Sequence, residues 1–162
     1  MHWILRDKDT RILTLSAVHL ALKPGGRFYF EFGGHGHVSE VFTALLYMLV
    51  QHGYSMEDAK KINRWFFPSK EWMQGALEQV GFTVEMIEID YRPTKLTSLD
   101  DGGLEGWIKL LGAPMVSAIR ADLRVEAVKQ VCRVLEPVVT KEEDGSQWLN
   151  YVRLRGVAKK DK

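Results

Sequence analysis

The sequence predicts an α/β fold, because helical and strand patterns alternate along its 162 residues. In several segments apolar residues recur every three or four positions, which is typical of helices with one buried face. Other segments are rich in aromatic and β-branched residues and are bounded by glycine or proline, which is typical of strands. The predicted order is helix, strand, helices, strand, helices, strand. We expect a single domain over residues 1–162, with about three strands covered by helices.

The N-terminal part predicts a helix followed by an inner strand. Asp9 is the expected N-cap of a helix over 10–22. One face of this helix carries Ile12, Leu15, Val18 and Leu22. The segment "KPGG" then predicts a turn, because proline cannot continue a helix. Residues 27–32, "RFYFEF", have apolar or aromatic residues on both faces, as expected for a strand inside a covered sheet.

Further helices and a long strand are predicted in the middle of the chain. We expect a helix over 39–52, a short one starting at a Ser55–Asp58 capping box, and a third between Ser69 and Gly81. The strand expected over 82–91 changes its apolar register near Met86. A bulge at that point or partial burial of both faces would explain the change.

The C-terminal part predicts a loop, three helices and a final strand. The loop covers 92–103, and two short helices follow over 104–111 and 113–119. A long helix from Arg120 is expected to stop before Pro137. The final strand, over 147–158, places Arg153 and Arg155 on one face and Val152 and Leu154 on the other.

Composition excludes several classes of protein. Hydrophobic residues make up 46% of the chain, which suits a real core, and the net charge of +1 argues against capture of nucleic acid. The single cysteine, Cys132, lies on an apolar helical stripe and is expected to be a core thiol rather than a nucleophile. The longest apolar stretch, 41–50, is too short to span a bilayer, and the N-terminus lacks a signal-peptide pattern. We therefore expect a cytoplasmic protein that does not bind membranes.

The segment "GGHGH", 33–37, follows the first predicted strand. Its two histidines are too few for a zinc site, so we expect no metal. The loop leaves the carboxyl end of a strand, which is where ligands bind in open α/β sheets. It also suits a tight strand-to-helix connection, and the sequence leaves both interpretations open.

The segment "LKPGGRFYFEFGG" resembles S-adenosylmethionine-dependent methyltransferases of the Rossmann-like class, in which a helix ends in "LKPGG" and the fifth strand follows. Three later segments resemble the trans-aconitate methyltransferase-like branch of that family: "FFPSKEWMQGALEQVGFTVEMIEIDYRPTKL", "GLEGWIKLLGAPMVSAI" and "WLNYVRLRGVAKK". The resemblance covers nearly the whole chain. It implies methyl transfer to a small metabolite, with a carboxylate as one option, and a helical lid region.

The resemblance also implies that this chain corresponds to the C-terminal half of such an enzyme. The family's glycine-rich turn after the first strand and the acidic residue ending the second strand, which hold the cofactor, have no counterpart here. We therefore expect an incomplete, truncated domain that does not bind S-adenosylmethionine alone and is inactive in isolation. The alternative is a non-catalytic dimerisation or interaction module.

An incomplete sheet would leave the strand at 27–32 without its neighbour. Phe28, Phe30 and Phe32 would lose cover, and so would the first helix. Since an open apolar edge is a template for pairing, we expect a homodimer or swapped dimer through this edge.

Site residues follow from the resemblance. Trp3 would border the cofactor. The substrate would meet residues of the glycine loop, the lid and the strand ends: Gly34, His35, His37, Arg92, Trp107 and Tyr151. Arg92 suits a carboxylate, although an ordinary surface arginine at a strand end is the slightly favoured interpretation. Glu31 is the strand-end carboxylate that could act as a base, and no catalytic residue is assigned.

Overall fold

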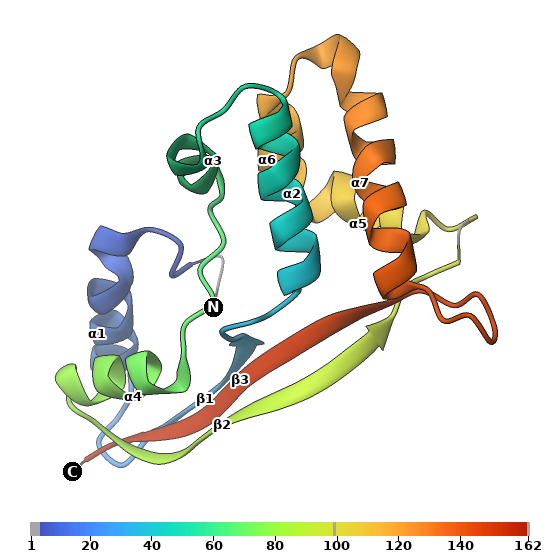
Figure 1. Cartoon of the computed structure of the whole chain (residues 1–162). Coiled ribbons are helices and arrows are strands. Elements are labelled where there is room, and N and C mark those ends of the chain that lie inside the picture. The colour runs from blue at the N-terminus through green and yellow to red at the C-terminus, as the bar shows by residue number, and fades with distance from the viewer. Residues whose placement is uncertain (1–3, 99, 162) are drawn as a thin grey trace. The chain divides into compact units, whose positions relative to one another are not determined.

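The computed structural model describes residues 4–98 and 100–161 (Figure 1). A three-stranded sheet has the order β1–β3–β2, with β1 at Arg27–Gly33, β2 at Phe82–Lys95 and β3 at Trp148–Lys160. This confirms the predicted α/β class. The chain divides into two compact units. The sheet unit comprises Met1–His37, Trp65–Arg92 and Tyr151–Lys162, and the helical unit comprises Val38–Arg64 and Pro93–Asn150.

The sheet unit packs two helices on one face of its strands. These are α1 (Arg11–Ala21), which follows the short 3₁₀ turn η1 (Lys8–Thr10), and α4 (Lys70–Gln79). Both lie on the same side of the sheet in Figure 1. They bury a core that combines helix and strand side chains: Leu5, Leu15, Phe30, Phe32, Met73, Ala76, Leu77, Phe82, Leu154 and Ala158.

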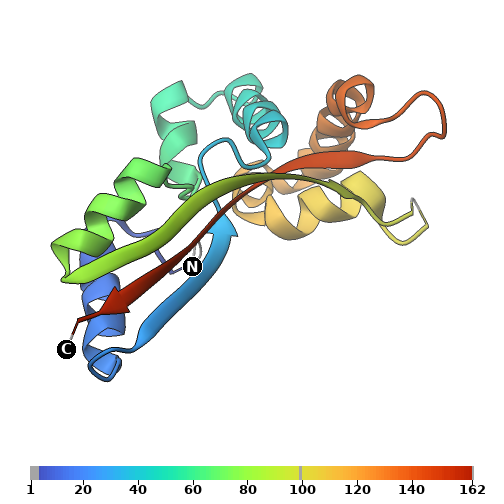
Figure 2. The same cartoon turned by 90° about the horizontal axis from the view of Figure 1, so that it is seen from below.

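Strand pairing determines which β1 residues enter this core. Figure 2 shows β3 between the other two strands of the sheet. β1 runs antiparallel to β3, with Phe28 opposite Ala158, Phe30 opposite Gly156 and Phe32 opposite Leu154. Even-numbered β1 side chains therefore face the helices. Phe30 is 7% exposed and Phe32 is 1% exposed, whereas Tyr29 is 69% exposed. The expectation that the phenylalanines and the first helix lose their cover is wrong, because α1 and α4 supply it from within the chain.

Three further boundaries differ from the sequence predictions. Asp9 does not cap α1: the N-cap of that helix is Thr10, whose side chain makes no cap hydrogen bond. Asp7 caps the preceding turn η1, and its side chain accepts the Asp9 N–H at 3.1 Å. β2 continues to Lys95 through residues expected in a loop. The long helix does not stop before Pro137: it spans Arg124–Val139 as α7, with Pro137 in its last turn, although proline has no N–H to donate to the preceding turn.

The register change within β2 is confirmed. Phe82 and Val84 pack against the core, but so does Ile87, whose number has the opposite parity. The residues on the opposite face of the strand also change from odd to even numbers, since Glu85 hydrogen-bonds to Arg27 there and Glu88 to Arg155. One extra residue between Glu85 and Ile87 produces this change, as a bulge does.

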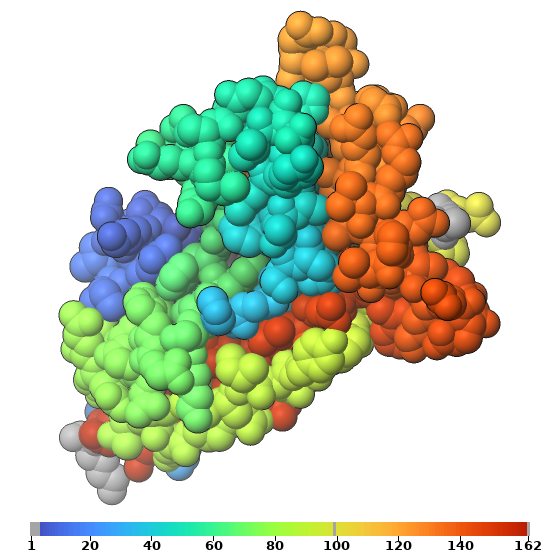
Figure 3. All heavy atoms as spheres, viewed as in Figure 1, coloured from blue at the N-terminus to red at the C-terminus, as the bar shows by residue number. Residues whose placement is uncertain are grey.

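The helical unit contains α2 (Ser39–Gln51), α3 (Met56–Ile62), α5 (Gly103–Leu111), α6 (Ala113–Ala118), η2 (Ala121–Leu123) and α7. α2 and α7 pack along each other, and their surfaces adjoin in Figure 3. Ser55 caps α3 by accepting the Asp58 N–H at 3.0 Å, as predicted. In the sheet unit Ser69 likewise caps α4, by accepting the Trp72 N–H at 3.2 Å.

Cys132 lies on α7 and is half-buried. Burial, with a smaller contribution from Glu105, raises the pKa of its thiol. Because the thiolate is the reactive form, we expect Cys132 to be alkylated at pH 7.5 more slowly than free cysteine. Timed labelling with iodoacetamide and mass spectrometry measures this rate. Labelling as fast as a free thiol, in protein that remains folded, would contradict the assignment as a core thiol.

Candidate functional site

The loop at residues 33–37 is held tightly at the end of β1. The Gly34 N–H donates to the Val152 carbonyl at 3.0 Å, and the His35 N–H donates to the Pro68 carbonyl at 2.9 Å. Gly36 has φ +87°, a conformation that favours glycine. At Gly33, an added Cβ would lie 2.8 Å from the rings of both His37 and Phe67. The glycines therefore permit a close approach of backbone and aromatic rings, which explains the glycine-rich sequence.

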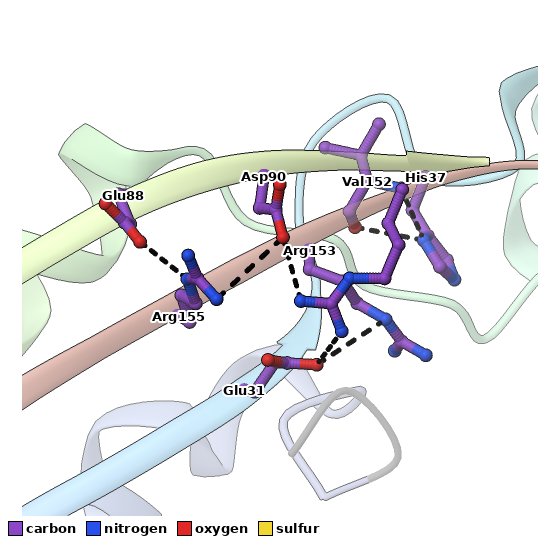
Figure 4. Close-up of polar contacts among 8 residues, drawn as sticks. Glu31, His37, Glu88, Asp90, Val152, Arg153 and Arg155 are labelled. Carbon is purple, nitrogen blue, oxygen red and sulfur yellow. Dashed lines mark hydrogen bonds and ion pairs between the residues drawn. The ribbon is translucent and has the colours of Figure 1, made fainter.

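His37 is buried at the base of this loop, 7% exposed. Its Nδ1 lies 3.1 Å from the Val152 N and 3.0 Å from the Val152 O (Figure 4). Nδ1 can accept from the N–H or donate to the carbonyl, but not both. The carbonyl already accepts from Gly34. If Nδ1 accepts, the Val152 N–H has an acceptor and the Val152 carbonyl still has its donor, the Gly34 N–H. We therefore assign the ring proton to Nε2.

Aromatic rings surround His37 within the sheet unit. Its ring centroid lies 4.9 Å from that of Phe67 and 4.7 Å from that of Tyr151, and Trp65 lies 5.9 Å from Phe67. We call the rings of His37, Trp65, Phe67 and Tyr151 the aromatic wall. The structure thus brings together three predicted site residues, Gly34, His37 and Tyr151. His35, in contrast, is exposed.

Replacing His37 by alanine is expected to lower the free energy of unfolding by about 1–3 kcal/mol, because the partly buried Val152 N–H loses its acceptor. Urea unfolding followed by tryptophan fluorescence measures the change. His35→Ala is the matched control and should have little effect, since His35 is exposed. Equal stabilities of the two variants would show that the imidazole contact with β3 contributes nothing.

The sheet face opposite α1 and α4 carries paired charges. We call this set, Glu31, Glu88, Asp90, Arg92, Arg153 and Arg155, the charged face. Figure 4 labels all of its residues except Arg92, along the three strands. Arg92 donates to Glu31 at 3.2 Å and to Asp90 at 2.8 Å. Arg155 donates to Glu88 at 2.6 Å, and this bond raises the pKa of the Arg155 guanidinium. Alternating strand residues therefore line up cations and anions across the sheet.

These pairs bear on two residues singled out from the sequence. Arg92, the proposed carboxylate ligand, already contacts two carboxylates of its own unit. Glu31, named as a possible base, accepts from Arg92 and lies 3.9 Å from the Nε of Arg153. Both side chains therefore have an ion-pairing role on the sheet face.

The other two predicted site residues lie elsewhere. Trp107 is half-buried on α5 in the helical unit. Trp3 lies outside the described residues. Sequence reasoning placed Arg153 and Arg155 on one face of their strand but attached no function to them, because the carboxylates that they face are far away in the sequence.

No group of three or more metal-ligating side chains occurs within 4–98 and 100–161. No helix in the described part of the chain is long and apolar enough to cross a membrane.

Comparison with known proteins gives one sequence relative. The chain is 32% identical over 163 aligned residues to a protein of the fission yeast Schizosaccharomyces pombe named "Uncharacterized methyltransferase C70.08c". The alignment covers 99% of this chain and 60% of the yeast protein, so the chain spans less than two thirds of its relative's length. No protein-family model matches the chain.

A solved structure shows a similar fold. A crystal structure from Bacillus halodurans, of a protein provisionally assigned as a methyltransferase, superposes with a TM-score of 0.52 at 12% identity. The match covers 94% of this chain and 59% of the bacterial one. A phosphoethanolamine N-methyltransferase of Haemonchus contortus matches with a TM-score of 0.37 at 16% identity, over 96% of this chain and 30% of that one. The chain is thus a sequence relative of a protein named as a methyltransferase, and it has the fold of part of a structure assigned to that class.

Proposed function

We propose that this chain is the C-terminal part of an S-adenosylmethionine-dependent methyltransferase of the trans-aconitate methyltransferase-like branch. The observation that carries the proposal is the 32% identity to the yeast protein along 99% of the chain. The fold is compatible with a methyltransferase, since a structure assigned to that class superposes with a TM-score of 0.52 over 94% of this chain.

The chemistry of methyl transfer makes few demands on the protein. The sulfonium of the cofactor is already activated, so alignment of the nucleophile with the methyl group does most of the work. In the complete enzyme, Trp3 would border the cofactor. Gly34, His35, His37, Arg92, Trp107 and Tyr151 would border a small-metabolite substrate. The aromatic wall and the charged face support a site that combines an apolar surface with fixed charges.

The half-enzyme proposal predicts a difference in cofactor binding. Titration of this chain with S-adenosylmethionine in a calorimeter should give no binding tighter than high micromolar. A longer protein that includes any glycine-rich segment encoded upstream of Met1 should bind it. Tight binding by the 162-residue chain itself would contradict the half-enzyme proposal but support a cofactor site. Failure of both proteins to bind would contradict the methyltransferase proposal.

We also propose that the outer edge of β1 pairs with another strand, and that in the isolated chain this strand comes from a second copy. β1 is the terminal strand of the order β1–β3–β2. The Gly34 N–H bonds to β3, and Gly34 continues the register of Phe28, Phe30 and Phe32. In this alternation the N–H groups of Tyr29 and Glu31 point to the outer edge. This edge also favours the alternative function, a dimerisation or interaction module.

Multi-angle light scattering at micromolar concentration tests the dimer. We expect wild type and Tyr29→Ala to be dimeric, because alanine keeps the edge N–H. Tyr29→Pro should shift the protein toward monomer, because proline removes the outward donor and is tolerated at an edge. Pairing through this edge would be contradicted if folded wild type were monomeric, or if wild type, Tyr29→Ala and Tyr29→Pro all had the same molar mass.

A further inference from the structure

Arg153 differs from the other arginines of the charged face. Its Nε is buried and has no hydrogen-bond partner. Within the described residues it donates no hydrogen bond, and its one ion pair is a long contact of 3.9 Å from Nε to Glu31. Arg92 and Arg155, in contrast, each donate to a carboxylate at 3.2 Å or closer. A guanidinium with a buried, unsatisfied donor is costly unless something else binds it.

Arg153 lies beside an apolar wall and is still partly accessible. Its partner in the strand register is Gly33, the last residue of β1, which is buried, with the rings of His37 and Phe67 in the place of a side chain. The Cζ of Arg153 lies 5.1 Å from the ring centroid of Tyr151, and Tyr151 contacts His37 in the aromatic wall. The side chain of Arg153 is 27% exposed, so a solute can reach it. An apolar flank strengthens a charged hydrogen bond by excluding water.

The nearest anion does not satisfy this guanidinium. Glu31 hydrogen-bonds to Arg92, so its charge is already compensated. Figure 4 shows the dashed contact from Arg153 to Glu31 at Nε. The two Nη groups have no acceptor among the described residues. A planar guanidinium offers a fork of parallel N–H donors that fits two oxygens of one oxyanion.

We propose that Arg153 anchors an oxyanion site at the end of β1, binding a carboxylate or phosphate group of a ligand beside the ring of Tyr151. The site deepens the proposed function, because it assigns the anionic part of the substrate to Arg153 rather than to Arg92. It does not depend on methyl transfer for its detection, since binding to the 162-residue chain can be measured directly.

Arginine-detected ¹H–¹⁵N NMR tests the site through the Nε–H resonances. The probes are citrate and inorganic phosphate at constant ionic strength, with chloride as the control anion. We expect the Arg153 Nε–H resonance to shift saturably with one or both probes and not with chloride. The probe that saturates at the lower concentration identifies the source of the oxyanion as a carboxylate or a phosphate.

Three variants complete the experiment, and their affinities are compared with that of wild type through backbone ¹H–¹⁵N shifts in the same titrations, because Arg153→Gln and Arg153→Lys have no Arg153 Nε–H resonance. Arg153→Gln should weaken binding at least about tenfold, because hydrogen bonds between charged groups are the strong ones. Arg153→Lys should bind with intermediate affinity, since it keeps the charge but loses the fork. Arg27→Gln is the matched control: Arg27 lies on the same sheet face but is paired through two hydrogen bonds to Glu85, and its removal should leave the affinity unchanged.

Several outcomes would overturn the proposal. These are no shift of the Arg153 resonance at millimolar citrate or phosphate, equal affinities of wild type and a folded Arg153→Gln variant, or an equal loss in Arg27→Gln. Backbone ¹H–¹⁵N spectra establish that each variant is folded. Loss of cofactor binding in the longer protein would leave the oxyanion result intact, so the two proposals fail separately.

Discussion

Replacing Phe32 by alanine is expected to lower the free energy of unfolding by about 3–5 kcal/mol, the cost of emptying a large buried aromatic site. Phe32 is 1% exposed and belongs to the core beneath α1 and α4. Its ring centroid lies 5.7 Å from that of Phe30, so truncation also removes an aromatic contact. Urea denaturation followed by circular dichroism measures the loss.

Tyr29→Ala is the matched control for this experiment. Tyr29 lies on the same strand but on the opposite face and is 69% exposed. Its truncation should cost less than about 1 kcal/mol, the span of strand propensities. Comparable losses at the two positions would mean that the helices do not protect the even-numbered face of β1, as would be the case if the sheet lacked cover.

Gly156→Ala is expected to destabilise the protein by about 1–3 kcal/mol through overpacking. An added Cβ at this β3 position would lie 2.6 Å from the Cζ of Phe30 and 2.7 Å from the Met86 carbonyl oxygen. The ring of Phe30 is itself buried and has little room to turn. The carbonyl belongs to β2 and cannot move without disturbing the strand. The same urea experiment measures this effect.

Gly75→Ala provides the opposite control. Gly75 lies within α4, and an added Cβ there would meet nothing within 4 Å. Because alanine is a better helix former, this change should stabilise the protein by up to about 1 kcal/mol. If both glycine variants stabilised the protein, the close passage of β1, β3 and β2 at Gly156 would be refuted.

Local signals predicted most of the secondary structure. Ser55 and Ser69 mark two helix starts because a serine side chain can accept the N–H three residues later, within the same few residues. The helix at α1 and the strand at β1 follow from the spacing of their apolar residues. The errors lie at element boundaries. The long helix was expected to stop before Pro137 and the strand β2 to end at residue 91, and where each element ends depends on what it packs against.

The site was less accessible to sequence reasoning. The glycine loop and Tyr151 were identified through a family resemblance, and the structure adds that His37 joins them by its contact with Val152. Arg153 had a visible signal in its alternation with Arg155. No signal in the sequence showed that Arg153 lacks a hydrogen-bond partner. The nearest carboxylate, Glu31, lies more than a hundred residues earlier in the chain and pairs more closely with Arg92.

The sequence by itself determined the types of segment, the caps of α3 and α4, and the apolar face of α1, because each depends on neighbours a few residues away. It predicted a β1 covered on both faces, whereas Tyr29 on the second face is 69% exposed. Tertiary structure decided the strand order β1–β3–β2, the pairing of Gly33 with Arg153, and the contact of His37 with Val152, 115 positions apart. Such contacts form only when distant segments meet. Strand register then determines which charged side chains find hydrogen-bond partners and which, like Arg153, keep a donor without one.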